Sequence, residues 1–181
     1  MRIHLLGPSG SGTSSLGRAL SKDLAVPYFD SDDIFWENTD PPFTAKRPLE
    51  QRQNLLKEID LTNRSWIIGG SMLQWGDFLR DRIDLIVYLY VDRVTRVSRL
   101  KTREKARFGD RILPGNDMHE NHRAFIAWAE SYEDGGLDMR SRMSETAWID
   151  EAKCKVVRIE REIPIEDEVA LVRARLREIT G

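Results

Sequence analysis

The sequence predicts an α/β protein in which helices cover both faces of a parallel sheet. Apolar strand-like runs alternate with segments of helical periodicity along the 181 residues, and this alternation is typical of parallel sheets. The run Leu85–Val91 is apolar on both faces, as a central parallel strand must be. A glycine-rich turn at Gly7–Ser15 joins the first expected strand to the first expected helix. The length fits one domain, residues 1–181.

Five short apolar runs predict the strands, and glycine ends two of them, at Gly7 and at Gly69-Gly70. The five runs are Arg2–Leu6, Pro27–Asp30, Ser65–Ile68, Leu85–Val91 and Lys155–Ile159. Ligands of such sheets bind beyond the carboxyl ends of the strands. We therefore expect function in the segments that follow them, which are Gly7–Ser15, Asp30–Asp33, Gly69–Ser71 and the residues from Asp92 onward.

Helices are predicted where apolar residues recur at three- and four-residue spacing. The predicted helices are Ser14–Leu24, Pro48–Leu61, Arg93–Phe108, Asn121–Tyr132 and Pro164–Thr180. Pro48 suits the first turn of the second helix because that position needs no amide donor. The last helix begins with acidic residues and ends with arginines, a polarity that its dipole favours.

The composition excludes several classes of function. Lys and Arg number 28 against 30 Asp and Glu, so the net charge of −2 offers no basic excess for nucleic acid or an anionic membrane. The longest apolar runs are far shorter than a membrane span or a signal peptide. Cys154 is the single cysteine, which excludes an intrachain disulfide and a cysteine-based zinc site. We expect a cytoplasmic protein with small-molecule partners, and the sequence does not indicate an oligomeric state.

The segment from Gly7 to Ser14 matches the phosphate-binding pattern G-x-x-x-x-G-K-[ST] at all positions but one. Glycines let the backbone amides turn inward around phosphate oxygens, and the following helix adds its free N–H groups. Ser14 takes the position of the metal-binding hydroxyl. The residues expected to bind the phosphates of a nucleoside triphosphate are Gly7, Ser9, Gly10, Ser11, Gly12, Thr13, Ser14 and Ser15.

The exception to the pattern is Thr13, which stands where the loop has its lysine. A lysine would place an ammonium on the outer phosphates, whereas threonine offers a hydroxyl. Charge stabilisation is the main catalytic contribution in phosphoryl transfer. Either another cation supplies that charge, or activity is low or absent. A turn that binds nothing is the other interpretation, and the place of the loop in the first strand–helix unit disfavours it.

Three carboxylates, Asp30, Asp32 and Asp33, follow the second expected strand. They would face the phosphate-binding loop across the cleft, where one could orient magnesium-bound water and another could accept a proton from a substrate hydroxyl. Capping of the next helix is the alternative role. Of the three, we expect Asp33 to cap the helix more than Asp30 or Asp32.

Eight basic and two acidic residues lie between Arg93 and Arg111. Arginines at three- and four-residue steps share one face of the expected helix, and these are Arg96, Arg99, Arg103 and Arg107. Gly109 and Pro114-Gly115 then end the helix. An arginine face beside a loop suits a lid that closes over phosphates and offers replacements for the missing lysine. For about half of these residues a solvated basic face explains the pattern equally well.

These motifs together resemble the small P-loop kinases, a group that includes the nucleoside-monophosphate, shikimate and gluconate kinases. Asp30-Ser31-Asp32 and Gly69-Gly70 resemble the shikimate-kinase branch. Phe35-Trp36 and Trp66-Ile67-Ile68 are similar to the adenylate-kinase-like proteins that are often named topology-modulation proteins. The resemblance implies a three-layer P-loop NTPase fold with a five-stranded parallel sheet in the order 2-3-1-4-5, an acceptor-binding region at residues 34–64 and a lid at residues 100–118.

The resemblance also implies ATP, Mg²⁺ and a small phosphate acceptor, and it assigns roles to residues. Gly69 stands where many members have an aspartate after the third strand. Magnesium would therefore be held by Ser14 and Asp30. The acceptor would meet Asp30, Asp32, Gly69, Gly70 and either Arg47 or Arg52. The residues expected to act in catalysis are Asp32, facing the acceptor, and Arg107 and Arg111, closing on the phosphates.

Three functions follow as hypotheses. The first is an ATP-dependent phosphotransferase acting on a nucleoside monophosphate or a small hydroxyl metabolite. Some cytidylate-type kinases resemble this Gly-Ser-Gly-Thr arrangement, so Thr13 is compatible with activity. The second is a nucleotide-binding protein with weak or no transfer activity and a regulatory role, which Thr13 favours. The third is a nucleic-acid-associated protein using the basic face, which the net charge of −2 disfavours.

Overall fold

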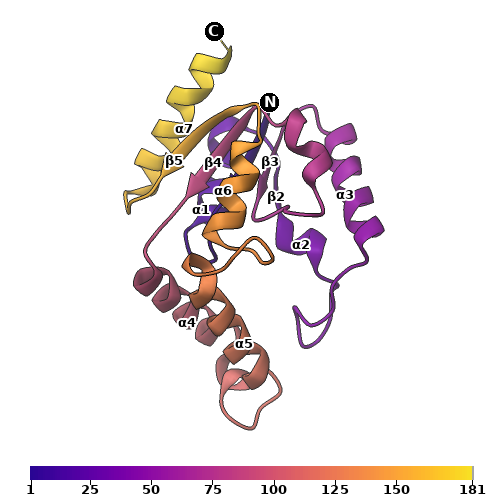
Figure 1. Ribbon diagram of the computed structural model, residues 1–181, viewed down its shortest axis with the longest axis vertical. Helices are drawn as coiled ribbons and strands as arrows, with labels where there is room; N and C mark the ends of the chain where they lie inside the picture. Colours follow the sequence, from indigo (N-terminus) through magenta and orange to yellow (C-terminus); the bar gives the residue numbers. More distant parts are fainter. Residues whose placement is uncertain (181) are drawn as a thin grey trace.

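The computed structural model describes residues 1–180 and confirms the predicted α/β fold (Figure 1). Five strands form one parallel sheet in the order β2-β3-β1-β4-β5, as the resemblance implied. The strands are β1 (Arg2–Leu6), β2 (Tyr28–Asp30), β3 (Trp66–Gly69), β4 (Leu85–Leu89) and β5 (Lys155–Ile159). The register places Leu5 of β1 beside Gly69 of β3 and Val87 of β4, so the loops that follow these strands gather at one edge of the sheet.

The five predicted helices lie within a few residues of their expected bounds. They are α1 (Thr13–Leu24), α3 (Leu49–Thr62), α4 (Arg93–Phe108), α5 (His119–Glu130) and α7 (Ile165–Thr180). The prediction missed α2 (Ser31–Phe35) and α6 (Arg142–Asp150), which are too short for a clear helical period. Three short 3₁₀ helices complete the elements: η1 (Asp77–Arg82), η2 (Gly109–Ile112) and η3 (Ser131–Glu133).

Two apolar layers hold the helices against the sheet. Alternate residues of a strand face opposite sides. On β4, Leu85, Val87 and Leu89 therefore pack with side chains of α1 and α7, whereas Ile86 and Tyr88 pack with side chains of α3 and α6. The central strands are buried on both faces, which explains their continuous apolar sequences.

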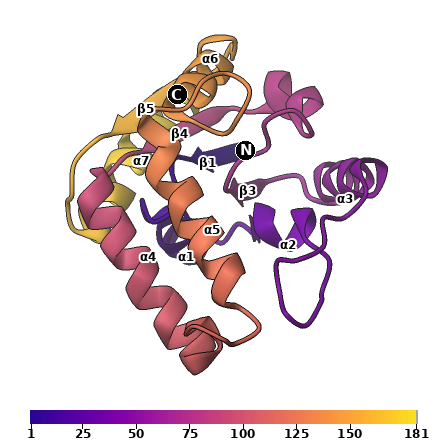
Figure 2. The same cartoon turned by 60° about the horizontal axis from the view of Figure 1, so that its bottom comes forward.

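The helices α4 and α5 form a pair beyond the edge of the sheet, and Figure 2 shows them side by side. Val97, Leu100, Ile126 and Ala129 make a small apolar cluster between them. Within residues 1–180, no helix combines the length and the apolar composition that crossing a bilayer requires.

One polar side chain lies in the middle of the sheet. His4 on β1 is fully buried, its Nε2 lies 2.8 Å from the carbonyl oxygen of Gly70, and its ring meets the edge of Trp148. Burial lowers the pKa of His4 to about 4, although the Gly70 contact opposes the shift. His4 is therefore neutral in the folded protein near pH 7 and links β1 to the turn after β3.

Lowering the pH is expected to destabilise the protein through His4. The unfolded chain takes up a proton below pH 6.5, whereas the folded chain takes it up only near pH 4. Stability is therefore lost as the pH falls between these values, by about 3 kcal/mol for this shift. Urea unfolding at pH 7 and pH 4.5 would measure the loss in the free energy of unfolding. The contribution of His4 is the difference between the losses of wild type and His4→Gln. Equal pH dependence of the two proteins would contradict the prediction.

Candidate active site

The glycine-rich loop between β1 and α1 has a backbone that only glycine adopts easily. Gly7, Gly10 and Gly12 have φ angles of +146°, +87° and +105°. A Cβ atom at Gly7 would lie 2.0 Å from the carbonyl oxygen of Leu89, and one at Gly10 would lie 2.6 Å from that of Arg96. The loop is therefore packed tightly against β4 and α4, and its shape depends on both.

The loop ends at an uncapped helix. Gly12 precedes α1, no side chain caps the helix, and no acidic residue lies in its first turn. The first backbone N–H groups of α1 are thus available to an anion. The hydroxyl of Ser11 is buried and has no hydrogen-bond partner within the described residues. A phosphate group in the loop would satisfy these donors together.

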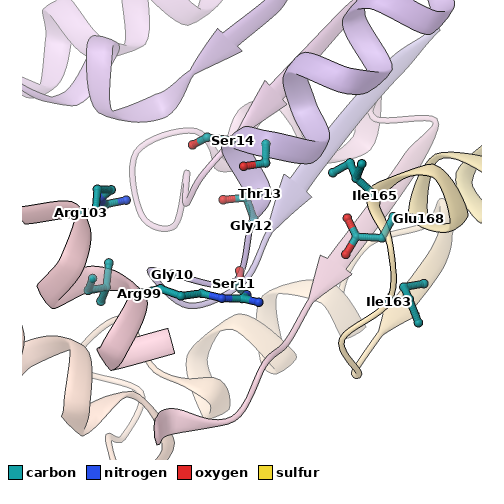
Figure 3. Close-up of a pocket in the computed structure, with 12 residues that line it drawn as sticks. Gly10, Ser11, Gly12, Thr13, Ser14, Arg99, Arg103, Ile163, Ile165 and Glu168 are labelled. Carbon is teal, nitrogen blue, oxygen red and sulfur yellow. The ribbon is translucent and has the colours of Figure 1, made fainter. Parts of the chain in front are cut away.

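A pocket of about 420 Å³ opens over this loop (Figure 3). Six of the eight residues predicted to bind the donor phosphates line it: Gly10, Ser11, Gly12, Thr13, Ser14 and Ser15. The opposite walls come from α4, through Arg99, Leu100 and Arg103, and from the segment entering α7, through Ile163, Ile165 and Glu168. Sequence reasoning did not assign the α7 wall, because its residues lie about 150 positions beyond the loop and show no motif.

The two arginines of the pocket differ in how far they are neutralised. Arg99 forms an ion pair with Glu162. Among the described residues, Arg103 pairs only with its neighbour Glu104, at 4.0 Å. Thr13 lies on the floor between the walls and contributes no charge. The site is thus an amide-lined pocket whose cations come from α4.

Asp30 at the end of β2 accepts three hydrogen bonds. The hydroxyls of Ser14 and Tyr28 donate to Oδ2 at 2.9 and 3.0 Å, and the backbone N–H of Asp32 donates to Oδ1 at 3.1 Å. Asp30 therefore caps α2. The expectation that Asp33 is the preferred cap was wrong, because α2 begins at Ser31, one residue after Asp30.

The Ser14–Asp30 pair brings two oxygen ligands to the edge of the loop, and oxygen is what Mg²⁺ prefers. Within residues 1–180, no group of three or more His, Cys, Asp or Glu side chains could hold a metal ion. This agrees with the usual binding of Mg²⁺ through one or two protein oxygens together with substrate phosphates. The residues present therefore fit a magnesium ion that arrives with a nucleotide.

Asp32 stays open to solvent in the first turn of α2. The surrounding protein and the charge of Asp30 raise its pKa, while Arg140 and Arg103 act in the opposite direction. A carboxylate with a raised pKa is a better proton acceptor than an ordinary aspartate. The predicted role of Asp32 in catalysis stays a prediction that this exposure and the raised pKa are consistent with.

Gly69 and Gly70 make room for the β2–α2 junction. A Cβ at Gly69 would lie 2.6 Å from the hydroxyl of Tyr28, and one at Gly70 would lie 2.0 Å from that of Ser31. Gly70 also has a φ of +98°. Close packing thus explains both glycines, and their predicted contact with the acceptor stays a prediction.

Of the two arginines predicted to hold the acceptor, Arg47 is already engaged. Its guanidinium donates to the carbonyl oxygens of Ile34 and Trp36 at 3.0 Å, where it fastens the end of α2. Arg52 lies over the rings of Phe35 and Trp75, and its buried Nε has no hydrogen-bond partner within residues 1–180. Of the two, Arg52 therefore keeps an unpaired donor, and the predicted contact of either arginine with the acceptor stays a prediction.

The predicted lid arginines lie away from the loop in this structure. Arg107 lies over the ring of Phe43, 4.7 Å from its centroid. Arg111 donates to Asp117 and, at 2.7 Å, to Asp40. Both contacts join the lid to the segment between α2 and α3. That Arg107 and Arg111 close on phosphates stays a prediction, and it requires these contacts to break.

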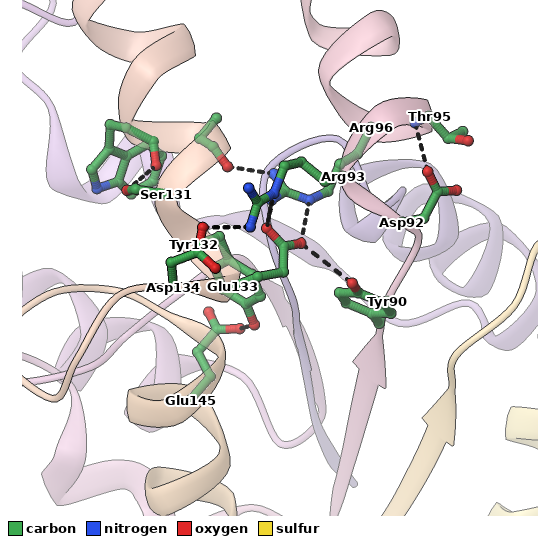
Figure 4. Close-up of polar contacts among 12 residues, drawn as sticks. Tyr90, Asp92, Arg93, Thr95, Arg96, Ser131, Tyr132, Glu133, Asp134 and Glu145 are labelled. Carbon is green, nitrogen blue, oxygen red and sulfur yellow. Dashed lines mark hydrogen bonds and ion pairs between the residues drawn. The ribbon is translucent and has the colours of Figure 1, made fainter.

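Another arginine reaches the loop without having been predicted. Arg140 lies just before α6, and its Nη2 donates to the carbonyl oxygen of Gly7 at 2.5 Å. Its Nε donates to the fully buried Glu145 at 2.8 Å. Figure 4 shows Glu145 receiving the hydroxyl of Tyr132 as well. Arg140 stands in an irregular segment 133 residues from Gly7, so no local pattern marks it.

Comparison with known proteins agrees with this geometry. The model of a family described as AAA domain matches residues 3–127. The chain is 39% identical over 168 residues to the uncharacterized protein YqaC of Bacillus subtilis (strain 168), covering 92% of each chain. It is 29% identical over 140 residues to a cytidylate kinase of Sulfurisphaera tokodaii, covering 71% of this chain and 77% of that one.

Solved structures share the fold. A deoxyadenosine kinase from M. mycoides with bound dATP matches with a TM-score of 0.57 and 15% identity, covering 98% of this chain and all of that one. A shikimate kinase from Bacteroides thetaiotaomicron matches with a TM-score of 0.55 and 22% identity, covering 98% of each chain. The chain therefore belongs to the AAA domain family of P-loop proteins, and its fold is that of the P-loop kinases.

Proposed function

We propose that the protein is an ATP-dependent phosphotransferase that acts on a nucleoside monophosphate or a small hydroxyl metabolite. One observation carries the proposal: the uncapped amides of Gly10–Ser14 form the floor of a pocket of about 420 Å³, with the Ser14–Asp30 oxygen pair at its edge. This combination provides for a polyanion and for its metal counter-ion in one place.

We expect ATP to bind in this pocket. The phosphates rest on the loop amides, and the nucleoside lies between Arg99 and Arg103 on one wall and Ile163 and Ile165 on the other. Apolar and guanidinium surfaces both suit the face of a base. Ser14 and Asp30 would hold Mg²⁺, which would neutralise charge on the phosphates.

The acceptor lies on the far side of the phosphates, over the region of residues 34–64. For a hydroxyl acceptor, Asp32 takes the hydroxyl proton as the acceptor oxygen forms a bond to the γ-phosphorus. The bond from that phosphorus to the β–γ bridging oxygen breaks, and ADP leaves with the electron pair. Arg52 holds an anionic group of the acceptor, and the lid at residues 100–118 brings Arg107 and Arg111 toward the phosphates.

The alternative is a nucleotide-binding protein that transfers no phosphate and acts in regulation. Thr13 is the residue that favours it, because the loop itself supplies no ammonium. The two functions share the donor pocket and differ in turnover. They are therefore separated by measuring binding and transfer in the same preparation.

Calorimetry with ATP and MgCl₂ tests the shared part, and ADP formation across a panel of nucleoside monophosphates, hydroxy acids and sugar acids tests transfer. Gly10→Ala is the loop variant, because its Cβ would collide with the carbonyl of Arg96. Gly115→Ala is the matched control, since Gly115 has a similar φ of +85° but open space around it. No heat at millimolar ATP would refute both functions, whereas heat without turnover would favour the alternative.

Binding of ATP is expected to weaken as the pH rises from 6 to 8. Burial raises the pKa of Glu168 in the donor pocket to about 7, with Arg99 opposing the shift. The side chain is therefore largely neutral at pH 6 and negatively charged at pH 8, where it repels the triphosphate. We expect about a threefold to tenfold increase in Kd that Glu168→Gln removes, measured by calorimetry against wild type. Parallel pH profiles of the two proteins would contradict this.

A further inference from the structure

A loop that binds triphosphates without a lysine needs a cation from elsewhere, and the arginines around it can be compared one by one. Arg99 is paired with Glu162, and Arg103 lines the donor pocket from α4, with no contact to Gly7 among the described residues. Arg107 and Arg111 are held on the segment between α2 and α3. Among the described residues, these four leave the start of the loop without a cation.

Arg140 fills that place. Its Nη2 contacts the carbonyl oxygen of Gly7, the first residue of the phosphate-binding pattern, and its Nε is fixed by Glu145. The side chain is only 20% exposed, whereas Glu145 is fully buried. No hydrogen bond from Nη1 is present within residues 1–180. The guanidinium is thus fastened on two sides beside the start of the loop, and Nη1 keeps its donors.

The charges around Arg140 agree with this placement. The charge of Arg140 acts to lower the pKa of Asp32, the residue expected to face the acceptor. Burial alone would lower the pKa of Arg140, but the charge and the hydrogen bond of Glu145 raise it. The guanidinium therefore stays charged beside the loop, and Glu145 orients it.

We propose that Arg140 takes the part of the absent lysine: its guanidinium contacts the outer phosphates of the bound triphosphate and stabilises the charge that develops during transfer. This rests on the proposed phosphotransferase function. Arg140 is then a catalytic residue, and Glu145 is a positioning residue. Thr13 is tolerated because a cation already occupies the mouth of the loop from the α6 side.

The test first removes the cation at position 140 and then adds a lysine at position 13. Arg140→Met alone would leave Glu145 buried without its partner and could cost folding, so the main variant is Arg140→Met/Glu145→Gln. We expect it to weaken ATP binding about tenfold or more, as loss of a charged hydrogen bond predicts. We expect kcat to fall by a factor of about 10²–10³. Arg142→Met is the matched control, because Arg142 lies over Tyr90 and pairs with Glu160 at the surface.

Placing a lysine at position 13 then shows whether Arg140 acts through its charge or only supports the shape of the loop. Adding Thr13→Lys to the double variant is expected to recover at least tenfold in kcat and most of the ATP affinity. The same substitution in wild type should change either quantity less than about threefold, and this non-additivity is the signature of two cations serving one site. A purely structural contact between Arg140 and Gly7 would not be rescued from position 13.

Each result bears on the proposal. Unchanged ATP affinity and kcat in the double variant, or no rescue by Thr13→Lys, would overturn it, as would a rise in the KM of the acceptor alone. If wild type binds ATP but transfers no phosphate, the ATP affinities of the same variants show whether Arg140 contacts the phosphates. If wild type binds no ATP, the proposed function fails together with this assignment, and the first calorimetric titration identifies that case.

Discussion

Replacing Asp32 by asparagine is expected to lower kcat by a factor of about 10²–10⁴ with a hydroxyl acceptor, the range for losing a general base. The amide keeps the shape of the side chain but cannot accept a proton. ATP affinity should stay within about threefold of wild type, because Asp32 lies in α2 and does not line the donor pocket. The variant therefore separates transfer from binding.

The control for this experiment is the next residue. Asp33→Asn removes a neighbouring exposed carboxylate from the same helix, so general electrostatic effects appear in both variants. Because the surroundings of Asp32 raise its pKa, the acid limb of the wild-type kcat profile should lie above the ordinary range of an aspartate. Asp32→Asn should lose that limb. Equal kcat values for the two variants would exclude Asp32 as the base.

The fold was predictable because its signals are local. Each central strand is a short run that must be apolar on both faces, and glycines mark where β1 and β3 end. Five long helices showed their period, whereas the five residues of α2 are too few to show one. The nine-residue helix α6 is preceded by Ser141, which forms a capping box with Ser144. This pair differs from the usual Ser-x-x-Glu signature, so the sequence did not mark the start of the helix.

The candidate site was only partly predictable, for a related reason. The glycine-rich loop and the Ser14–Asp30 pair follow from motifs at the ends of β1 and β2. Arg140, Ile163 and Glu168 reach the site through tertiary packing, and nothing in their neighbourhood distinguishes them from surface residues. Asp30 shows how one residue serves both fold and site, since its two oxygens divide between capping α2 and contacting Ser14.

The largest expected loss of stability comes from the buried pair that fastens α4 to η3. Arg96 is fully buried and donates to Glu133 at 2.6 and 3.2 Å and to the carbonyl oxygen of Ala129 at 2.7 Å (Figure 4). Glu133→Ala leaves this guanidinium buried without its carboxylate. We expect a loss of about 3–5 kcal/mol in the free energy of unfolding, measured by urea denaturation.

Asp134→Ala is the comparison for that experiment. Asp134 also accepts from Arg93, but it is 72% exposed, so its loss should cost no more than about 1 kcal/mol. Equal stabilities of the two variants would show that Arg96 finds another partner. The backbone of Arg96 also lies against Gly10, where an added Cβ would come within 2.6 Å of its carbonyl oxygen. A shift of α4 in Glu133→Ala should therefore weaken ATP binding as well, because the loop keeps its shape only while α4 stays in place.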